Sequence, residues 1–243
     1  MHYRIGTRGS KLALVQSEYV KRRMEEAYPE DTFELVIIKT TGDKVTDKPL
    51  AAIGTKGLFV KEIEEALLSG SIDMAVHSMK DMPAECATGL TFAKAWKRED
   101  CRDVLILKTA GSFSKLPSGA VIGTGSLRRA CQLAMLRPDI QFTAIRGNVD
   151  TRINKLMDDS YGLDGIVLAA AGLNRLGRSS EITEYLDPEV VIPAPAQGVL
   201  AIETAEVNTE LLDKINALSD DNSDREAVAE RTFLRLTGGG CPD

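Results

Sequence analysis

The chain has 243 residues, 43% hydrophobic and 27% charged, which is the composition of a globular protein with one or two domains. Its formal net charge of −6 and pI near 5.2 exclude a nucleic-acid-binding protein, because the scattered lysines form no basic stripe. No apolar run approaches the roughly 20 residues of a membrane span and no signal-peptide core follows Met1, so we expect a cytoplasmic protein without membrane or nucleic-acid partners.

Apolar runs alternate with helical patterns through the first third of the chain. This βαβ order predicts a mostly parallel sheet with helices on its faces. The expected strands span residues 3–6, 33–38 and 72–76, and the expected helices span residues 12–28 and 58–68.

The same alternation resumes after the charged stretch Lys97–Asp103, which we expect to be an exposed crossover to a second α/β domain. In that domain we expect strands at 104–107, 120–122, 142–145, 166–169 and 190–192, and helices from Ser126 to Leu136 and from Asn148 or Asp150 onward. A strand at 199–203 and a helix at 209–218 are then expected to return the chain to the first domain.

The last segment has a different pattern. Ser223-Asp-Arg-Glu226 is a capping-box signature that predicts a helix to Leu236, with Val228, Phe233 and Leu236 on one side. A helix followed by a glycine run cannot form a core, so we expect the opening of a third unit whose remainder is missing. The sequence thus predicts an α/β protein with domain 1 at 1–97 and 198–219, domain 2 at 98–197, and a helical remnant of a third domain at 220–243.

The four cysteines are widely spaced and form no C-x-x-C pair: Cys86, Cys101, Cys131 and Cys241. Because the chain has only two histidines, the pattern predicts neither a zinc site nor a disulfide framework. We therefore expect four free thiols and no metal.

Two segments, Gly123–Arg129 and Arg146–Arg152, place arginines at predicted helix starts. Backbone N–H groups at a helix start favour anions, and the planar arginine fork suits a carboxylate or phosphate. Arginine without an anion is unfavourable at that end of a helix. The segments therefore predict an anion site, and the alternative is a set of surface arginines on solvated turns.

The segment His77–Pro83 follows a predicted strand and so lies at the carboxyl end of a parallel strand, where open α/β sheets bind ligands. Lys80 and Asp81 are its candidate functional groups, and the alternative is an ordinary turn with a surface ion pair. The same sheet edge is expected to gather further donors from other segments: Arg8, Ser10 and Lys56.

Several segments occur together in one known family, and their order is specific although each alone is weak. They are Arg4-Ile-Gly-Thr-Arg-Gly-Ser10, Leu12–Gln16, Lys56–Glu62, His77–Asp81, Gly123–Arg129, Arg146–Arg152, Ala169–Leu173, Ala194–Gly198 and Gly239–Cys241. From Arg4 to Cys241 the chain resembles hydroxymethylbilane synthase, also called porphobilinogen deaminase.

The resemblance implies two domains of the type II periplasmic-binding-protein kind around a cleft, and a third, smaller α+β domain. It implies a transferase that deaminates porphobilinogen and joins it head to tail into the linear tetrapyrrole hydroxymethylbilane, in haem, chlorophyll and cobalamin biosynthesis. It also implies a dipyrromethane cofactor attached by a thioether at Cys241.

In this resemblance Asp81 accepts from the pyrrole N–H, stabilises the azafulvenium cation left by loss of ammonia, and relays protons, with Lys80 beside it. The residues expected to bind carboxylates of substrate or cofactor are Arg8, Ser10, Lys56, Ser126, Arg128, Arg129, Arg146, Arg152 and Gln197. Gly125 and Ala52 depart from the family pattern, in which serine and lysine are common at these positions.

Two functions remain open. One is the transferase, and the other is a two-domain module that binds a pyrrole or the cofactor but needs a separately encoded third domain to act. We expect the chain alone to be a monomer that carries little or no covalent cofactor and is nearly inactive, because a tail ending near Cys241 cannot hold a reacting pyrrole.

Overall fold

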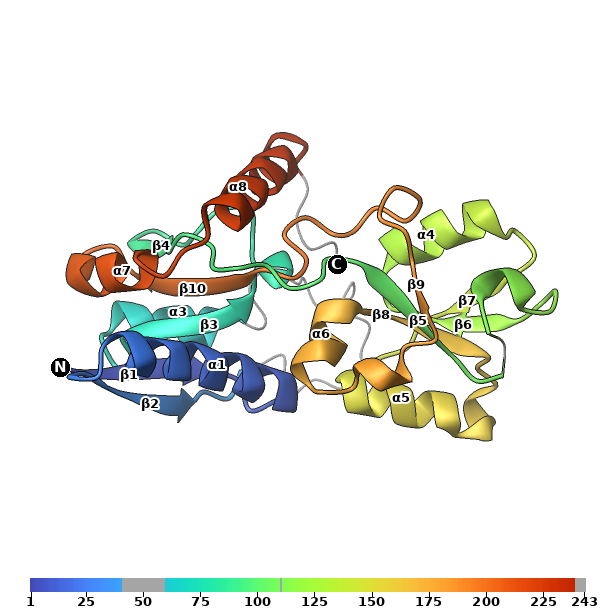
Figure 1. Ribbon diagram of the computed structural model, residues 1–243, viewed down its shortest axis with the longest axis horizontal. Helices are drawn as coiled ribbons and strands as arrows, with labels where there is room; N and C mark the ends of the chain where they lie inside the picture. Colours follow the sequence, from blue (N-terminus) through green and yellow to red (C-terminus); the bar gives the residue numbers. More distant parts are fainter. Residues whose placement is uncertain (41–59, 110, 239–243) are drawn as a thin grey trace. The chain divides into compact units, whose positions relative to one another are not determined.

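The computed structural model describes residues 1–40, 60–109 and 111–238, and it divides the chain into two compact units (Figure 1). Unit 1 comprises residues 1–99 together with the chain from Val199 onward, and unit 2 comprises residues 100–198. No helix in the described ranges is long and apolar enough to cross a membrane.

Unit 1 is a five-stranded mixed sheet in the order β2-β1-β3-β10-β4. Its strands are β1 (His2–Thr7), β2 (Thr32–Ile37), β3 (Met74–Ser78), β4 (Leu90–Phe92) and β10 (Leu200–Ala205). Its helices are α1 (Lys11–Ala27), α3 (Lys61–Leu68), α7 (Thr209–Asn216) and α8 (Asp221–Leu236), and a short 3₁₀ helix, η2 (Met79–Asp81), follows β3.

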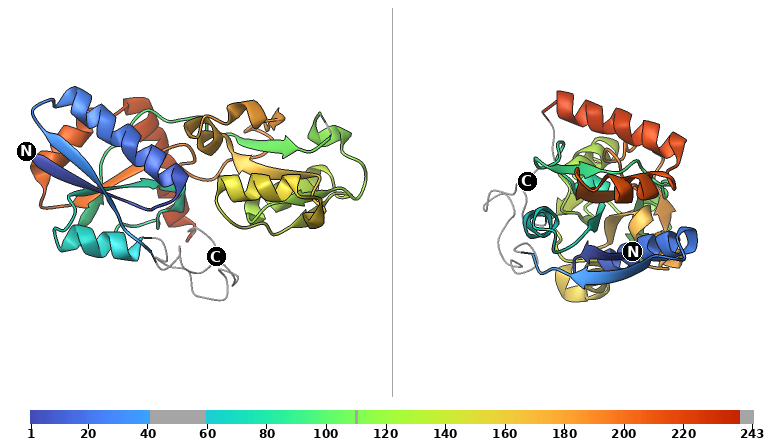
Figure 2. Two further views of the ribbon diagram at one scale, coloured as in Figure 1. Left: turned by 90° about the horizontal axis from the view of Figure 1, so that it is seen from below. Right: turned by 90° about the vertical axis from the view of Figure 1, so that its left-hand side faces the viewer.

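Helices cover both faces of this sheet, as the strand alternation requires (Figure 2). On one face, Met24 of α1 and Ile215 of α7 pack with Met74 of β3 in the larger core. On the other face, Ile63 of α3 packs with Ala75, the next residue of the same strand. Because β3 is buried on both sides, its end is held firmly where η2 begins.

Unit 2 repeats the plan with the strand order β7-β6-β8-β5-β9. Its strands are β5 (Asp103–Leu107), β6 (Val121–Gly123), β7 (Gln141–Thr143), β8 (Gly165–Ala169) and β9 (Glu184–Tyr185). Its helices are α4 (Leu127–Leu136), α5 (Val149–Met157) and α6 (Ala170–Arg175), with 3₁₀ turns η3 (Phe113–Lys115), η4 (Asp159–Tyr161) and η5 (Ser179–Glu181). Leu133 of α4 packs on one face, and Leu156 of α5 and Leu173 of α6 pack on the other.

The expectation of mostly parallel sheets is wrong in detail. In each sheet two described pairings are parallel, and the pairings of β10 with β3 and β4, and of β5 with β8 and β9, are antiparallel. β10 is the strand that returns from unit 2, so it enters the first sheet in the opposite direction. Direction cannot be seen in an apolar run, because only the connections determine it.

Two local predictions are also wrong. Residues 190–192 form no strand: the chain turns at residues 188–190, the amides of Val190 and Val191 both donate to the Asp187 carbonyl, and Ile192 is exposed. The last helix begins before the predicted capping box, because the Asp220 carboxylate caps it by accepting from the Ser223 amide at 2.8 Å. Two-residue β9 and three-residue β4 are too short for periodicity to reveal.

Helix α8 packs on unit 1 through residues between Ser223 and Arg231. Its residues Ser223 and Ala227 are buried, whereas Val228, Phe233 and Leu236, expected to share one side, are exposed. The assignment of residues 220–243 to a third domain stays a prediction.

Candidate functional site

The carboxyl ends of two neighbouring parallel strands bring the predicted residues of unit 1 to one sheet edge. β1 pairs with β3 in parallel, with Ile5 opposite Met74 and Gly6 opposite Ala75. Arg8 follows the end of β1, and Lys80 and Asp81 follow the end of β3 in η2. The structure therefore places these three residues in the loops of the same edge.

Helix α1 ties these two loops together. Its N-cap Ser10 accepts a hydrogen bond from the Ala13 amide at 3.3 Å, which stabilises the turn that follows Arg8. One turn further on, the Gln16 amide donates to the Ser78 hydroxyl at 3.0 Å, at the last residue of β3. Ser10 thus has a local structural role in addition to the predicted contact with a ligand.

Asp81 is exposed between two anchored residues. Met79 and Met82 on either side of it are buried, and the Met82 amide donates to the Met79 carbonyl at 3.1 Å. The backbone around Asp81 is therefore fixed while its carboxylate faces solvent. A fixed, accessible carboxylate is what a catalytic role requires.

Unit 2 presents a similar edge, formed by the parallel neighbours β6 and β7. Ser126 caps α4 by accepting from the Arg129 amide, and the Thr124 amide donates to the Thr143 carbonyl at 2.9 Å. A Cβ atom at Gly125 would lie 3.2 Å from the Ile145 carbonyl oxygen. The loops after β6 and β7 are so close that the smallest residue suits position 125, where the family pattern often has serine.

The start of α5 depends on a second glycine. Gly147 has φ +112, and a Cβ atom there would lie 2.5 Å from Thr151 Cγ2. Asn148 caps the helix by accepting from the Thr151 amide at 2.8 Å. Arg152 donates through Nε to the Gly147 carbonyl at 2.8 Å, which holds the stem of its side chain at the helix start. Arg146 directly precedes this turn.

A buried carboxylate, which the sequence interpretation missed, lies behind the α4 arginines. Asp103 Oδ1 accepts from Arg129 Nε at 2.9 Å and Nη2 at 2.7 Å, and Oδ2 lies 2.7 Å from Arg128 Nη1. Burial alone raises the pKa of Asp103, but the guanidinium groups of Arg129 and Arg128 outweigh it, so that the pKa lies below its usual value. The available signal was an acidic residue directly before the apolar run 104–107.

Gln197 belongs to the same network and is fully buried. Its side-chain amide donates to the Cys101 carbonyl at 2.7 Å and to Asp103 Oδ1 at 2.9 Å. The structure thus gives Gln197 internal partners, and Arg129, also buried, directs its fork at Asp103. Direct ligand contact by these two residues stays a prediction, which the observed geometry does not favour over a structural role.

On the face of the unit 1 sheet that α3 covers lies another buried pair, which sequence analysis did not identify. His77 Nε2 on β3 lies 3.2 Å from Glu203 Oε2 on β10, and both side chains are buried.

Cys86, Cys101 and Cys131 are free thiols, and burial raises the pKa of Cys86 to about 12. Such a thiol is inert at neutral pH.

Two predicted site residues, Lys56 and Cys241, and the departure at Ala52 lie outside the described residues.

A family model described as "Porphobilinogen deaminase, dipyromethane cofactor binding domain" matches residues 3–213 of this chain. A porphobilinogen deaminase from Lachnospira eligens is 99% identical over 99% of the chain, which spans 82% of that relative's length. One from Syntrophus aciditrophicus is 52% identical over 98% of the chain and 77% of its own length.

Solved structures show the same two-unit fold at low identity. The methionine-binding protein MetQ has a TM-score of 0.52 at 14% identity, covering 95% of this chain and 94% of its own. The periplasmic VFT2 domain of BvgS from Bordetella pertussis has a TM-score of 0.51 at 15% identity, covering 96% and 92%. These likenesses confirm the expected periplasmic-binding-protein kind of fold.

Members of the porphobilinogen deaminase family use a dipyrromethane cofactor and join porphobilinogen into hydroxymethylbilane in tetrapyrrole biosynthesis. Because the family model matches most of the sequence and the relatives match nearly its whole length, the chain belongs to this family.

Proposed function

We propose that in this chain Asp81 is the catalytic carboxylate of the porphobilinogen deaminase reaction. The observation that carries the proposal is its position: an exposed carboxylate between two buried residues, at a sheet edge whose neighbouring loop contains Arg8. Loss of ammonia from porphobilinogen leaves positive charge on the pyrrole, and a fixed carboxylate stabilises that charge without reorganising. The same oxygen atoms can accept and return protons.

Lys80, beside Asp81 in η2, supplies a cation for a carboxylate arm of a ring bound at this edge. Arg8, from the loop after β1, and Lys56 are proposed for the same task. Porphobilinogen has an acetate and a propionate arm, so one ring needs more than one cationic partner.

In unit 2 we propose Arg128, Arg146 and Arg152 as the carboxylate-binding side chains. They stand at the starts of α4 and α5, where backbone N–H groups also favour anions. Ser126 and Asn148, as caps, fix the two helix starts. The role we propose for Asp103 is to hold Arg128 and Arg129 in place, and the role we propose for Gln197 is to fix Asp103 through its hydrogen bond to Oδ1.

The donors of unit 2 fit the dipyrromethane group, because its propionate and acetate arms are anions of the kind that capped helix starts and arginine forks bind. Arg128, Arg146 and Arg152 would hold those arms, and Cys241 is proposed as the attachment point. When bound, the cofactor supplies the pyrrole carbon to which the first substrate ring is joined.

The test is the substitution Asp81→Asn, which keeps size and removes charge, made in a form of the protein whose parent turns over porphobilinogen; the kcat comparisons below use the same parent. We expect a loss of about 3 kcal/mol of transition-state stabilisation, roughly 150-fold in kcat for bilane formation from porphobilinogen. Glu85→Gln is the matched control, because Glu85 is an exposed carboxylate four residues further on and should leave kcat unchanged. Near-normal turnover of Asp81→Asn would refute the assignment.

A further inference from the structure

A single arginine of α8 holds the segment that directly follows Asp81. The Arg231 guanidinium donates to the carbonyl oxygens of Met82 and Ala84, each at 3.1 Å, and to that of Pro83. No backbone amide of the described chain donates to these three carbonyls. Arg231 is therefore their main hydrogen-bond partner.

Arg231 directs its charge at this turn and at no carboxylate. None of the described residues forms an ion pair with it, and burial lowers its pKa. Its guanidinium lies 5.4 Å from the centre of the Phe92 ring. Because three consecutive carbonyls converge on one rigid fork, a lysine would not reproduce the arrangement.

Helix α8 gives Arg231 a fixed base. The Ala95 amide donates to Asp224 Oδ1 at 2.8 Å, and the Arg98 amide donates to the Ser223 hydroxyl at 2.9 Å. The Arg98 guanidinium pairs with Glu230 at 2.6 Å, one residue before Arg231. The first ten residues of the helix are thus bound to the extended segment 93–98.

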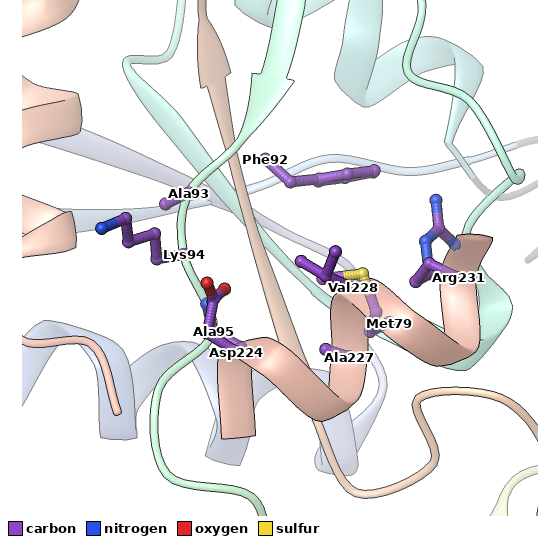
Figure 3. A pocket seen from close by; sticks show the side chains of 9 residues that line it. All are labelled: Met79, Phe92, Ala93, Lys94, Ala95, Asp224, Ala227, Val228 and Arg231. Atoms are coloured by element: carbon purple, nitrogen blue, oxygen red, sulfur yellow. The ribbon is translucent and has the colours of Figure 1, made fainter. Parts of the chain in front are cut away.

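Figure 3 shows the pocket beside this contact, with a volume of about 270 Å³. Met79 of η2, Phe92 of β4 and Val228 of α8 line it together with Arg231. Met79, which comes before Asp81, lines this pocket together with α8, and the Arg231-bound carbonyls come after Asp81, so α8 lies beside the catalytic loop on both sides of the carboxylate.

We propose that Arg231 is a positioning residue that fixes the backbone of residues 82–84 and thereby the Asp81 carboxylate. The inference rests on the proposed catalytic role of Asp81. Without the three hydrogen bonds the loop gains freedom, and displacement of a catalytic group by about 1 Å can cost up to roughly a hundredfold in rate. Of the cations proposed for substrate carboxylates only Lys80 lies beside this segment, and Arg231 itself is not among them, so substrate affinity should change less than kcat.

The substitution Arg231→Met removes the donors and keeps much of the stem. We expect kcat to fall at least about tenfold while KM changes less than about threefold. Arg231→Lys should give an intermediate kcat. Arg235→Met is the matched control, because Arg235 is an exposed arginine one turn later and should leave both parameters unchanged. Amide hydrogen exchange should accelerate over residues 79–86 in Arg231→Met and stay unchanged in the control.

A double variant separates this role from a general loss of structure. If Arg231 acts through Asp81, then Arg231→Met should reduce kcat no further when Asp81→Asn is already present. Unchanged kcat, unchanged exchange, a change in KM alone, or a full further loss in the Asp81→Asn background would each overturn the proposal. If Asp81→Asn itself were fully active, the catalytic assignment would fail, which is a distinct result.

Discussion

Asp81 in unit 1 and Asp103 in unit 2 are aspartates in opposite environments. Asp81 is exposed, and the surrounding loop is fixed by buried neighbours. Asp103 is fully buried, and its oxygen atoms face Arg129, Arg128 and Gln197. An aspartate that solvent or substrate can reach is suited to the catalytic role proposed for Asp81, whereas one surrounded by the protein's own cations, such as Asp103, is suited to a structural role.

This contrast suggests a division of labour between the two units. In the proposed assignment unit 1 supplies the catalytic carboxylate at a sheet edge and unit 2 supplies arginines, of which Arg128 and Arg129 are oriented by the buried Asp103. A guanidinium that is already paired with a carboxylate has a fixed orientation, so its remaining N–H groups can bind a ligand with little further loss of side-chain entropy. Asp103 should then matter for stability, and the arginines for binding.

The largest effect on stability is expected from Asp103→Asn. Removing one partner of a buried ion pair leaves Arg129 uncompensated, so the free energy of unfolding of unit 2 should fall by about 3 kcal/mol or more. Urea unfolding followed by far-UV circular dichroism measures it. Asp139→Asn is the control, because Asp139 forms an exposed pair with Arg137 and should change stability little. Equal effects of the two substitutions would contradict the distinction drawn here.

A smaller effect is expected from Gly147→Ala. The new Cβ would clash with Thr151 and the backbone would be strained at φ +112, at a cost of about 1–3 kcal/mol. Because this turn carries Arg146, KM for porphobilinogen should rise as well. Gly162→Ala provides the comparison: Gly162 has φ +60, but a methyl group added there would meet no atom within 4 Å, so only the modest strain applies and KM should not move. An unchanged KM in Gly147→Ala would separate this turn from binding.

The smallest effect concerns acid stability. The pKa of Asp103 is lower in the folded protein than the usual value of about 3.9, so its contribution to stability is present above that value and is lost as pH falls towards the folded pKa. Stability measured between about pH 5 and pH 3 should therefore fall less steeply in Asp103→Asn than in the parent. Identical slopes would mean that Asp103 does not titrate with folding.

Much of the fold was predictable because the relevant signals are local. The helix starts at Ser10 and Ser126 follow from capping residues before apolar periodic segments, and both caps are observed. The edge positions of Arg8 and Asp81 follow from parallel strand ends, and the pairing of β1 with β3 agrees.

The rest depended on contacts between residues distant in sequence. Asp103 and Gln197 are 94 positions apart, and Arg231 reaches Met82 over 149 positions. No periodicity or turn signal connects such residues, because burial and partner choice arise only when the sheets assemble. For the same reason the sequence predicts an exposed crossover at Lys97–Asp103, although its last residue is buried beside two arginines.

The most direct test of the division of labour is the affinity for porphobilinogen measured by equilibrium dialysis in an Asp81→Asn background, where slow chemistry leaves the substrate intact. Three proteins are compared: Asp81→Asn alone, with Arg146→Lys, and with Arg137→Lys as control. We expect Arg146→Lys to weaken binding about tenfold or more, because lysine keeps the charge but loses the fork, while Arg137→Lys should leave binding unchanged. Binding by the Arg146→Lys protein as tight as that of Asp81→Asn alone would contradict it.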